Sequence, residues 1–333
     1  MKKRILIFLL VLALAVLPVL AGCQQTEKND NTTIRLCEVT HSIFYAPQYV
    51  AIAKGFFEEE NITIELSNGG GADKVMSAVI SESVDIGLAG PEACVYVYNS
   101  GSEDYPEVFA QLTACDGSFL VAREPMPDFK WSDLAGAHIL PGRKGGMPYM
   151  AFRYAMEKNG VDPDSGANLD NTIQFDMMTG AFLGGTGDYV TMFEPVASGV
   201  EIEGKGYIVA SVGEAAGEMP YTTYFAKKSF LNENSDLVQR FTNAVVKGQE
   251  WVNTHTSVEI ANCVSDFFAD TDITLLASAI ESYKKIGAFA ATPVMTEEAF
   301  NRLQDVIQKA GELDKAAPFD KIINNTFAQK AMQ

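Results

Sequence analysis

Residues 33–66 read TIRLCEVTHSIFYAPQYVAIAKGFFEEENITIEL, and this stretch decides the fold class. It opens with a short, largely apolar run, Thr33–Val39, and closes with a second one, Ile62–Leu66. Between them the chain spaces its apolar residues as on one face of a helix, at Tyr49, Val50, Ala53 and Phe57. Lys54-Gly55 is typical of a helix end. The stretch therefore predicts a strand, a helix and a second strand.

The same alternation continues along the chain. Short apolar runs predict further strands at residues 83–90, 138–140, 172–175, 188–192 and 207–212. Amphipathic stretches lie between them, and from Ser235 onward the pattern is helical. Strands that alternate with helices are typical of α/β proteins in which helices cover a parallel sheet. We therefore predict an α/β fold.

Two breaks in the pattern indicate where domains meet. The two prolines of Glu124–Pro127 suit neither a helix nor a central strand, so we place a crossing just before them, near residue 121. The chain returns along Tyr221–Ala226, near residue 223. A length of 333 residues fits about two domains. We predict a discontinuous domain one, residues 33–120 plus 223–333, and a domain two, residues 121–222.

The N-terminus has the features of an export signal. Basic residues 2–4 precede an uncharged apolar stretch, residues 5–20, which ends at Leu-Ala-Gly-Cys, residues 20–23. This ending resembles the lipobox of bacterial lipoproteins, which implies that residues 1–22 are removed and Cys23 is lipidated. A transmembrane anchor is the alternative, but 16 residues fall short of the roughly 20 that span a bilayer. The polar residues 23–32 would form a flexible tether.

Charge excludes one class of partner. The formal net charge is −18, and removal of the basic residues 2–4 would make it more negative. Such a surface repels phosphates, so we expect no nucleic-acid partner. An apolar fraction of 47% is that of a folded globular chain. A local pocket can still oppose the overall sign, so the charge of a small ligand stays open.

Cysteine and histidine give no sign of a metal or redox centre. After Cys23 the cysteines are too widely spaced for a CxxC site, at Cys37, Cys94, Cys115 and Cys263. We expect buried free thiols, although an exported protein can form disulfides. The three histidines lie in no HExxH arrangement. We expect no metal and no cofactor.

The sequence around the first helix carries a resemblance that extends over most of the chain. Residues 41–62 are similar to the opening of periplasmic binding proteins of the nitrate, sulfonate, taurine and thiamine-pyrimidine-precursor class. Agreement continues at Gly69–Gly71, Val84–Gly87, Glu194-Pro195 and 318–328. The resemblance implies the type II fold, in which two α/β domains joined by two crossovers hold a ligand in the cleft between them. It also implies closure about a hinge and delivery to a membrane permease driven by an ATPase.

In an open α/β sheet, ligands lie beyond the carboxyl ends of the strands. Loops at those ends precede helix starts, whose free N–H groups can face a polar ligand. Three such loops of domain one supply the candidates His41, Phe44, Tyr45, Gly70, Gly71, Gly90 and Glu92. The alternative for each glycine is that it only turns the chain.

Domain two supplies a glycine loop, Pro141–Pro148, ahead of a helix. Arg143, Gly145 and Gly146 are candidates there, because cations at a helix N-terminus can hold an anion. The loop is not a Walker A motif, since Gly145 stands where Ser or Thr is required. A solvated pair of cations on a turn is the alternative.

Glu194 is the charged contact that we favour most. In the resembled family its loop closes over the ligand, and a carboxylate there suits a ligand with amino or ring N–H donors. The alternative is an acid that stabilises the start of a helix. One acid and several tyrosines, which could stack on a flat ligand, are weaker candidates: Asp116, Tyr149, Tyr189, Tyr221 and Tyr224.

These observations predict a lipid-anchored solute receptor of an ABC importer, working as a monomer outside the cytoplasm, and not an enzyme. The ligand would be flat and nitrogen-containing, like a thiamine-precursor pyrimidine, or else a sulfonate or nitrate. An alternative is an enzyme resembling the pyrimidine synthase of the same fold, but the cysteine-rich motif that marks those enzymes is absent. A sensor or adhesin domain without transport is a further alternative.

Overall fold

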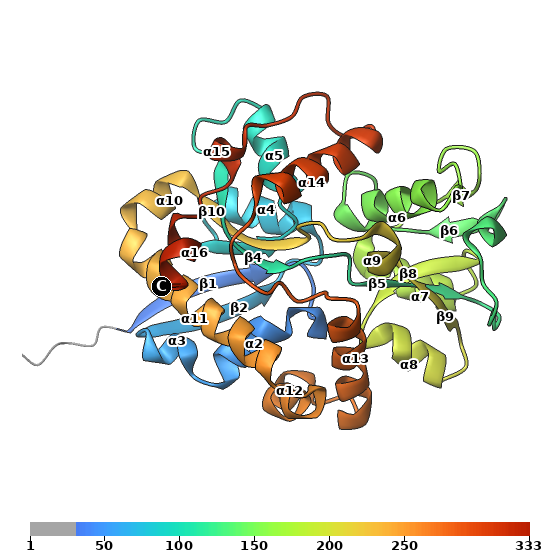
Figure 1. Cartoon of the computed structure of the whole chain (residues 1–333), viewed down its shortest axis with the longest axis horizontal. Coiled ribbons are helices and arrows are strands. Elements are labelled where there is room, and N and C mark those ends of the chain that lie inside the picture. The colour runs from blue at the N-terminus through green and yellow to red at the C-terminus, as the bar shows by residue number, and fades with distance from the viewer. Residues whose placement is uncertain (1–30) are drawn as a thin grey trace, which may run out of the picture. The chain divides into compact units, whose positions relative to one another are not determined.

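The computed structural model describes residues 31–333, and residues 32–333 form one compact unit. The predicted signal peptide, the predicted lipidation site Cys23 and most of the predicted tether lie outside the described residues. Within the described part, no helix is both long enough and apolar enough to cross a membrane. The unit contains two five-stranded sheets with helices around them, a mixed α/β architecture that confirms the predicted fold class (Figure 1).

The first sheet has the strand order β2-β1-β3-β10-β4. Its strands are β1 (Thr32–Glu38), β2 (Ile62–Asn68), β3 (Ile86–Ala89), β4 (Pro106–Thr113) and β10 (Thr222–Lys227). Strands β1, β2 and β3 are parallel, and β10 runs antiparallel between β3 and β4. The helices that follow the first three strands are η1 (Ile43–Tyr45), α2 (Ala46–Ala53), α3 (Phe56–Glu59), α4 (Ala72–Ile80) and α5 (Glu92–Asn99). The predicted strand–helix–strand unit is confirmed.

The second sheet has the order β7-β6-β8-β5-β9. Its strands are β5 (Ser118–Ala122), β6 (His138–Leu140), β7 (Asn168–Leu169), β8 (Tyr189–Phe193) and β9 (Tyr207–Ser211). Its helices are η2 (Trp131–Leu134), α6 (Met147–Lys158), η3 (Phe175–Met177), α7 (Met178–Leu183), α8 (Val196–Ile202) and α9 (Val212–Ala216). Strands β6 and β8 are parallel, so the loops after them leave the same edge of the sheet.

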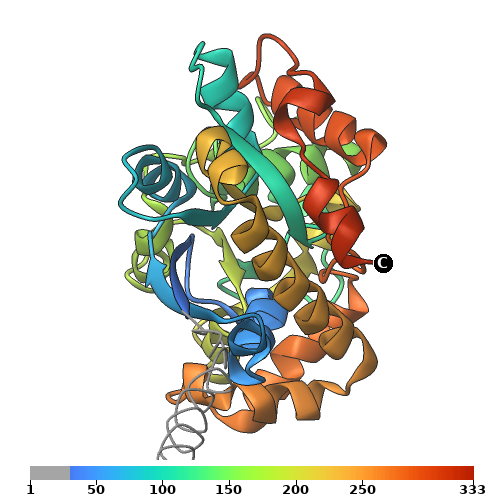
Figure 2. The same cartoon turned by 90° about the vertical axis from the view of Figure 1, so that its left-hand side faces the viewer.

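The C-terminal third is helical, as predicted, and covers the first sheet. It comprises α10 (Lys228–Glu233), α11 (Ser235–Thr254), α12 (Ser257–Val264), η4 (Ser265–Phe268), α13 (Ile273–Lys285), α14 (Glu297–Lys309), α15 (Phe319–Ile322) and α16 (Thr326–Ala331). Helix α11 packs against α2, α3 and α16, and Figure 2 shows it crossing the first sheet at a slant. Its inner side chains, such as Phe241 and Val245, are fully buried.

The chain passes between the sheets twice. The first passage lies between β4 and β5, at residues 114–117, and the return lies between β9 and β10. The expected crossing near residue 121 therefore falls inside β5, which pairs with β8 and β9 of the second sheet. The expected return near residue 223 likewise falls inside a strand, at the start of β10. The predicted domain limits themselves stay a prediction.

One predicted strand is wrong. Residues 172–175 are not a strand, and the edge strand β7 lies earlier, at Asn168–Leu169. The Asp170 carboxylate accepts hydrogen bonds from the Thr172 N–H (3.0 Å) and hydroxyl (2.6 Å), which turns the chain out of the sheet. This turn carries Phe175 away from the sheet to the start of η3.

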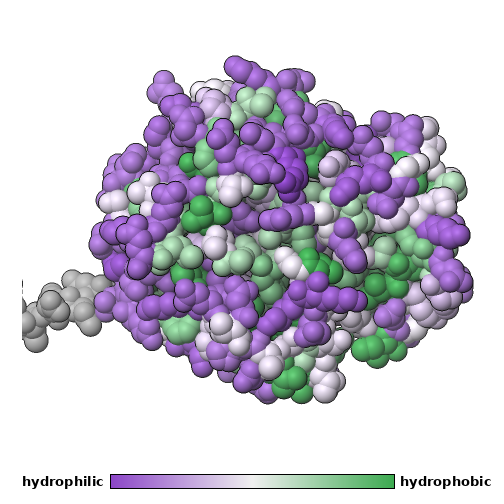
Figure 3. Space-filling view, viewed as in Figure 1, coloured by the Kyte–Doolittle hydropathy of each residue, from purple (hydrophilic) through white to green (hydrophobic). Residues whose placement is uncertain are grey.

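Within residues 31–333 the cysteines are free thiols, of which Cys37, Cys94 and Cys115 are buried and Cys263 is half-buried. On the face seen in Figure 3, hydrophilic residues predominate and hydrophobic ones occur in small groups. This face therefore fits the acidic composition and a chain surrounded by water.

Candidate functional site

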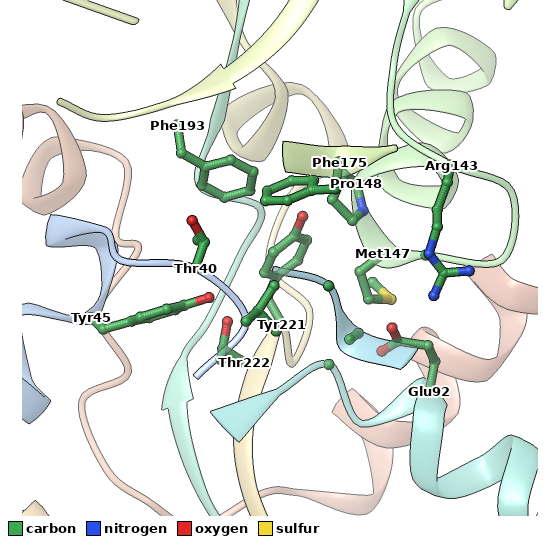
Figure 4. A pocket seen from close by; sticks show the side chains of 15 residues that line it. Thr40, Tyr45, Glu92, Arg143, Met147, Pro148, Phe175, Phe193, Tyr221 and Thr222 are labelled. Carbon is green, nitrogen blue, oxygen red and sulfur yellow. The ribbon is translucent and has the colours of Figure 1, made fainter. Parts of the chain in front are cut away.

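A cavity lies where loops from both sheets meet, and it holds about 550 Å³ of space not occupied by atoms. We call it the cleft cavity (Figure 4). From the first sheet it is lined by Val39, Thr40, Tyr45, Gly71, Ala72, Gly90, Glu92, Tyr221 and Thr222. From the second sheet it is lined by Arg143, Gly146, Met147, Pro148, Phe175 and Phe193. Most of these residues follow the carboxyl end of a strand or begin a helix, which is where ligands of α/β sheets lie.

Seven of the predicted site residues line this cavity: Tyr45, Gly71, Gly90, Glu92, Arg143, Gly146 and Tyr221. Gly90 shows why a glycine is needed in such a loop. A Cβ atom at this position would collide with the Glu92 carboxylate, which folds back over the loop. Gly90 therefore makes room for an acidic side chain at the cavity wall.

Glu92 is the first residue of α5, and its side chain is aimed at the cleft cavity (Figure 4). It is only 2% exposed, and its Oε2 atom has no hydrogen-bond partner. Burial raises the pKa of this carboxyl to about 7, and the nearby Arg143 charge lowers it only in part. A buried polar atom without a partner is costly to leave unmatched. Glu92 is thus ready to accept a hydrogen bond from a ligand.

Arg143 does not stand free beside Glu92. Its guanidinium forms an ion pair with Asp73 of α4 at 3.0 Å, and Lys144 lies 3.5 Å from Glu312. Both cations of the glycine loop are therefore engaged with acids from the side of the first sheet. Gly145 does not line the cleft cavity, and its carbonyl accepts a hydrogen bond from Tyr96 at 3.3 Å. These contacts disfavour the predicted anion clamp.

Aromatic side chains form another part of the wall. Phe193 lies 5.8 Å from Phe175 and 6.4 Å from Tyr221, centroid to centroid, so the three rings border one space (Figure 4). The Tyr221 hydroxyl has no hydrogen-bond partner of ordinary geometry. Burial, with the nearby Asp116 carboxylate, raises its pKa well above the usual range, so it stays a neutral donor. Flat ligands that carry an acceptor suit such a wall.

His41, Phe44 and Gly70 do not line the cleft cavity, unlike the sequence prediction. The His41 ring stacks on Phe268 at 4.7 Å, and its Nδ1 atom lies 3.2 Å from the buried Glu38 carboxylate, which raises the His41 pKa. Phe44 is fully buried behind the wall, 5.5 Å from Phe193. Gly70 has a φ of 69° and turns the chain ahead of α4.

The weaker candidates also lie outside the cavity, except Tyr221. Asp116 is fully buried, accepts hydrogen bonds from the Ser118 N–H (2.6 Å) and hydroxyl (2.5 Å), and has its pKa raised to about 6 by burial. Tyr189 packs among the side chains of the second sheet, 6.3 Å from Phe129. Tyr149 contacts Arg153, and the Tyr224 hydroxyl donates to Gln48 at 3.1 Å. These side chains contribute to packing around the site.

Glu194 requires the largest correction. Its carboxylate accepts hydrogen bonds from the Ser198 N–H (3.0 Å) and hydroxyl (2.6 Å), and it does not line the cleft cavity. These contacts match the alternative role, in which Glu194 is an acid that stabilises the start of a helix. Its backbone joins the two sheets: the Ser42 hydroxyl donates to the Glu194 carbonyl at 2.8 Å, and the Glu194 N–H donates to the Tyr283 hydroxyl at 2.8 Å.

Several lining residues were missed by the sequence analysis. Phe193 directly precedes the Glu194-Pro195 motif, so its place in the sequence could have identified it as a lining residue. Thr40 directly precedes the candidate His41, and Thr222 follows Tyr221. Phe175 fell in the strand that was predicted wrongly. Among residues 31–333 no three His, Cys, Asp or Glu side chains are grouped so that they could hold a metal ion.

The matched family model decides the family. Residues 43–257, more than half of the chain, match the model described as "NMT1/THI5 like". The chain belongs to the NMT1/THI5-like family. The loops of the cleft cavity at Tyr45, Glu92, Arg143 and Phe193 all lie inside the matched region.

Known proteins agree with this family. The chain is 44% identical over 311 residues to "Putative binding protein YtlA" of Bacillus subtilis (strain 168), covering 93% of this chain and 92% of that protein. The fold is similar to the ligand-binding component of an ABC-type import system from Staphylococcus aureus, with a TM-score of 0.73 at 13% identity, covering 90% and 99%. It is also similar to the alkanesulfonate-binding protein SsuA from Xanthomonas axonopodis pv. citri, with a TM-score of 0.71 at 12% identity, covering 89% and 99%. This NMT1/THI5-like chain therefore has the type II fold of periplasmic binding proteins.

Proposed function

We propose that this NMT1/THI5-like protein is the solute-binding component of an ABC importer, and that it captures a flat, nitrogen-containing organic ligand. The family, the 44% identical binding protein and the fold support binding as the activity. The relatives are named as binding proteins, so we propose capture of the ligand without a chemical step. The ligand would lie in the cleft cavity and pass to a permease driven by an ATPase.

One observation carries the choice of ligand: the buried Glu92 carboxyl beside the aromatic wall, whose Oε2 atom has no hydrogen-bond partner. A carboxylate recognises hydrogen-bond donors, such as an amino group or a ring N–H. The rings of Phe175, Phe193 and Tyr221 would contact the faces or edges of a flat molecule. The two features together favour a heteroaromatic ring that carries a donor.

The same wall disfavours the sulfonate and nitrate alternatives. Arg143 is the cationic side chain that lines the cleft cavity, and its guanidinium already pairs with Asp73 at 3.0 Å. An anion would lie near the Glu92 carboxylate, so it would have to break this ion pair or keep Glu92 protonated. The similarity to an alkanesulfonate-binding protein rests on 12% identity and concerns the fold.

Isothermal titration tests this proposal. We expect the residue 32–333 unit to bind 4-aminopyrimidine and related heteroaromatic amines, and to show no heat of binding with methanesulfonate or nitrate. Binding of methanesulfonate with no binding of any heteroaromatic amine would overturn the choice of ligand. Absence of binding to every organic solute in a broad metabolite panel would overturn the proposed function itself.

We propose that the protein acts outside the cytoplasm as a monomer, tied to the membrane by a lipid on Cys23, with residues 23–32 as its tether. Labelling cells with radioactive palmitate tests the anchor. The full chain should take up label and stay with the membrane fraction, whereas the Cys23→Ala variant should do neither. Equal labelling of both chains would contradict the anchor and leave the ligand proposal untouched.

A further inference from the structure

A second cavity adjoins the cleft cavity. Ala72, Glu92 and Arg143 line both spaces. The second cavity lies between α4, α5 and the glycine loop of the second sheet and encloses about 820 Å³, a volume that includes space open to solvent. Asp73, Tyr96 and Glu312 are among its walls, and we call it the acidic annex. A ligand group that reaches Glu92 from the cleft cavity is therefore next to the annex.

Carboxylates outnumber cations around this annex. Asp73, Glu92 and Glu312 line it, with Arg143 as the cationic side chain among its lining residues. Arg143 pairs with Asp73 at 3.0 Å, and Lys144, which does not line the annex, reaches Glu312 at 3.5 Å. Asp73 and Glu312 thus each have a cation beside them, whereas no ion pair within residues 31–333 reaches Glu92.

Glu92 stands at the junction of the two spaces. It is 2% exposed, its Oε2 atom is unpartnered, and its neighbour Arg143 is held by Asp73. A carboxylate buried in this way is stabilised most by a cationic donor, because a charge-assisted hydrogen bond also compensates the lost hydration. The unpartnered Oε2 atom, the excess of carboxylates and the adjoining space point to the same kind of ligand group.

We propose that the ligand carries a protonated amine on a short arm, with its flat ring against the aromatic wall of the cleft cavity and its amine on Glu92 at the mouth of the acidic annex. This inference rests on the proposed function, because it names the charge of the ligand and the placement of its arm within the same site. Any longer substituent on the amine extends into the annex, toward Tyr96 and Glu312.

Three probes of similar shape test how much the amine adds to the affinity of the ring: benzylamine, benzyl alcohol and benzoate. Titration followed by amide chemical shifts should show benzylamine binding about tenfold more tightly than benzyl alcohol, with benzoate weakest. Equal or tighter binding of benzyl alcohol would overturn the inference and leave the proposed flat-ring ligand intact. Failure of all three probes to shift any resonance of the cleft cavity would overturn the proposed function as well.

Two variants test which carboxylate binds the amine. In Glu92→Gln, benzylamine should lose its advantage while benzyl alcohol binds as before, because Gln keeps the shape and removes the charge. Glu312→Gln changes a carboxylate farther along the annex. In this variant benzylamine should still bind more tightly than benzyl alcohol, by nearly the wild-type factor. An advantage that survives in Glu92→Gln, or that disappears only in Glu312→Gln, would contradict the placement.

The wild-type chain provides a test that needs no variant. Below pH 7 Glu92 takes up a proton, so the advantage of benzylamine over benzyl alcohol should shrink as the pH falls from 8 to 6. An advantage that is constant over this range would contradict the role of Glu92 even if the variant failed to fold.

Discussion

Glu92 and Glu194 occupy comparable positions in the fold but have different roles. Each lies near the start of a helix that follows a strand, Glu92 beginning α5 after β3 and Glu194 preceding α8 after β8. Both are buried, at 2% and 1% exposure. The Glu194 carboxylate is satisfied by Ser198, whereas the Oε2 atom of Glu92 has no partner. A carboxylate that is satisfied within its own helix stabilises the fold, and one left unsatisfied at a cavity wall is available to a ligand.

The largest expected difference between the two acids concerns stability at pH 8. An unfolded glutamate has a pKa near 4.5, and burial raises that of Glu92 to about 7. Above pH 7 the unliganded fold therefore carries a buried charge that costs roughly 3 kcal/mol, a cost that disappears as the pH falls toward 4.5. Glu92→Gln should raise the free energy of unfolding by up to about this amount at pH 8, measured by urea unfolding.

Glu194→Gln should have a much smaller effect. Burial raises the pKa of Glu194 as well, but the Ser198 N–H and hydroxyl bind its carboxylate and offset part of that cost. Loss of the charge and weakening of the two hydrogen bonds act in opposite directions, so the free energy of unfolding should change by less than about 1 kcal/mol. A gain from Glu194→Gln as large as that from Glu92→Gln, or a loss of stability in Glu92→Gln at pH 8, would contradict the comparison.

The two variants should also differ in ligand binding, by a free energy slightly smaller than the difference in stability. Glu92→Gln removes the charged acceptor, so the dissociation constant for 4-aminopyrimidine should rise about thirtyfold, equivalent to about 2 kcal/mol. Glu194→Gln should change it less than about threefold, because its carboxylate does not line the cleft cavity. Isothermal titration of both variants at pH 8 measures the difference, and equal losses would remove the distinction.

The pH dependence of binding sharpens the same comparison. A donor ligand prefers the ionised carboxylate, which the unliganded protein holds above pH 7 and loses below it. The affinity should therefore fall about sixfold as the pH drops from 7 to 6, provided that the ligand itself does not titrate there. Glu92→Gln should flatten this profile, whereas Glu194→Gln should keep it. A wild-type affinity that rises on acidification would contradict the sign.

The aromatic wall should contribute the smallest change. Phe193→Leu keeps an apolar side chain but removes a ring 5.8 Å from Phe175, so 4-aminopyrimidine should bind about fivefold more weakly. Phe129→Leu, which removes a ring from the loop between β5 and η2, away from the cavity, is the matched control. Equal weakening by both variants would indicate a loss of fold and not of a ligand contact.

Local patterns were sufficient to predict the first strand–helix–strand unit, because its residues satisfy the helix and strand periods without outside help. The strand at 172–175 was predicted wrongly because a side-chain turn at Asp170 competes with sheet pairing. Strands β4 and β5 were not foreseen, since they are buried runs whose pairing depends on β10 and β8 elsewhere in the chain.

The same limit applies to the site. Loops at strand ends could be predicted, and they include Glu92 and Arg143. Which of two acids faces the ligand could not, because the answer depends on side-chain contacts. The Glu194 carboxylate is satisfied by Ser198, four positions along the chain, and Arg143 pairs with Asp73, which is far away in the sequence. Neither contact follows from the helix or strand period.

Native mass spectrometry of the protein purified without denaturation tests the central claim most directly. The wild-type chain and Glu194→Gln should both carry a small organic molecule that contains nitrogen, and Glu92→Gln should be free of it. Retention of the molecule by Glu92→Gln together with its loss from Glu194→Gln would contradict the assignment of Glu92 as the residue that holds the ligand.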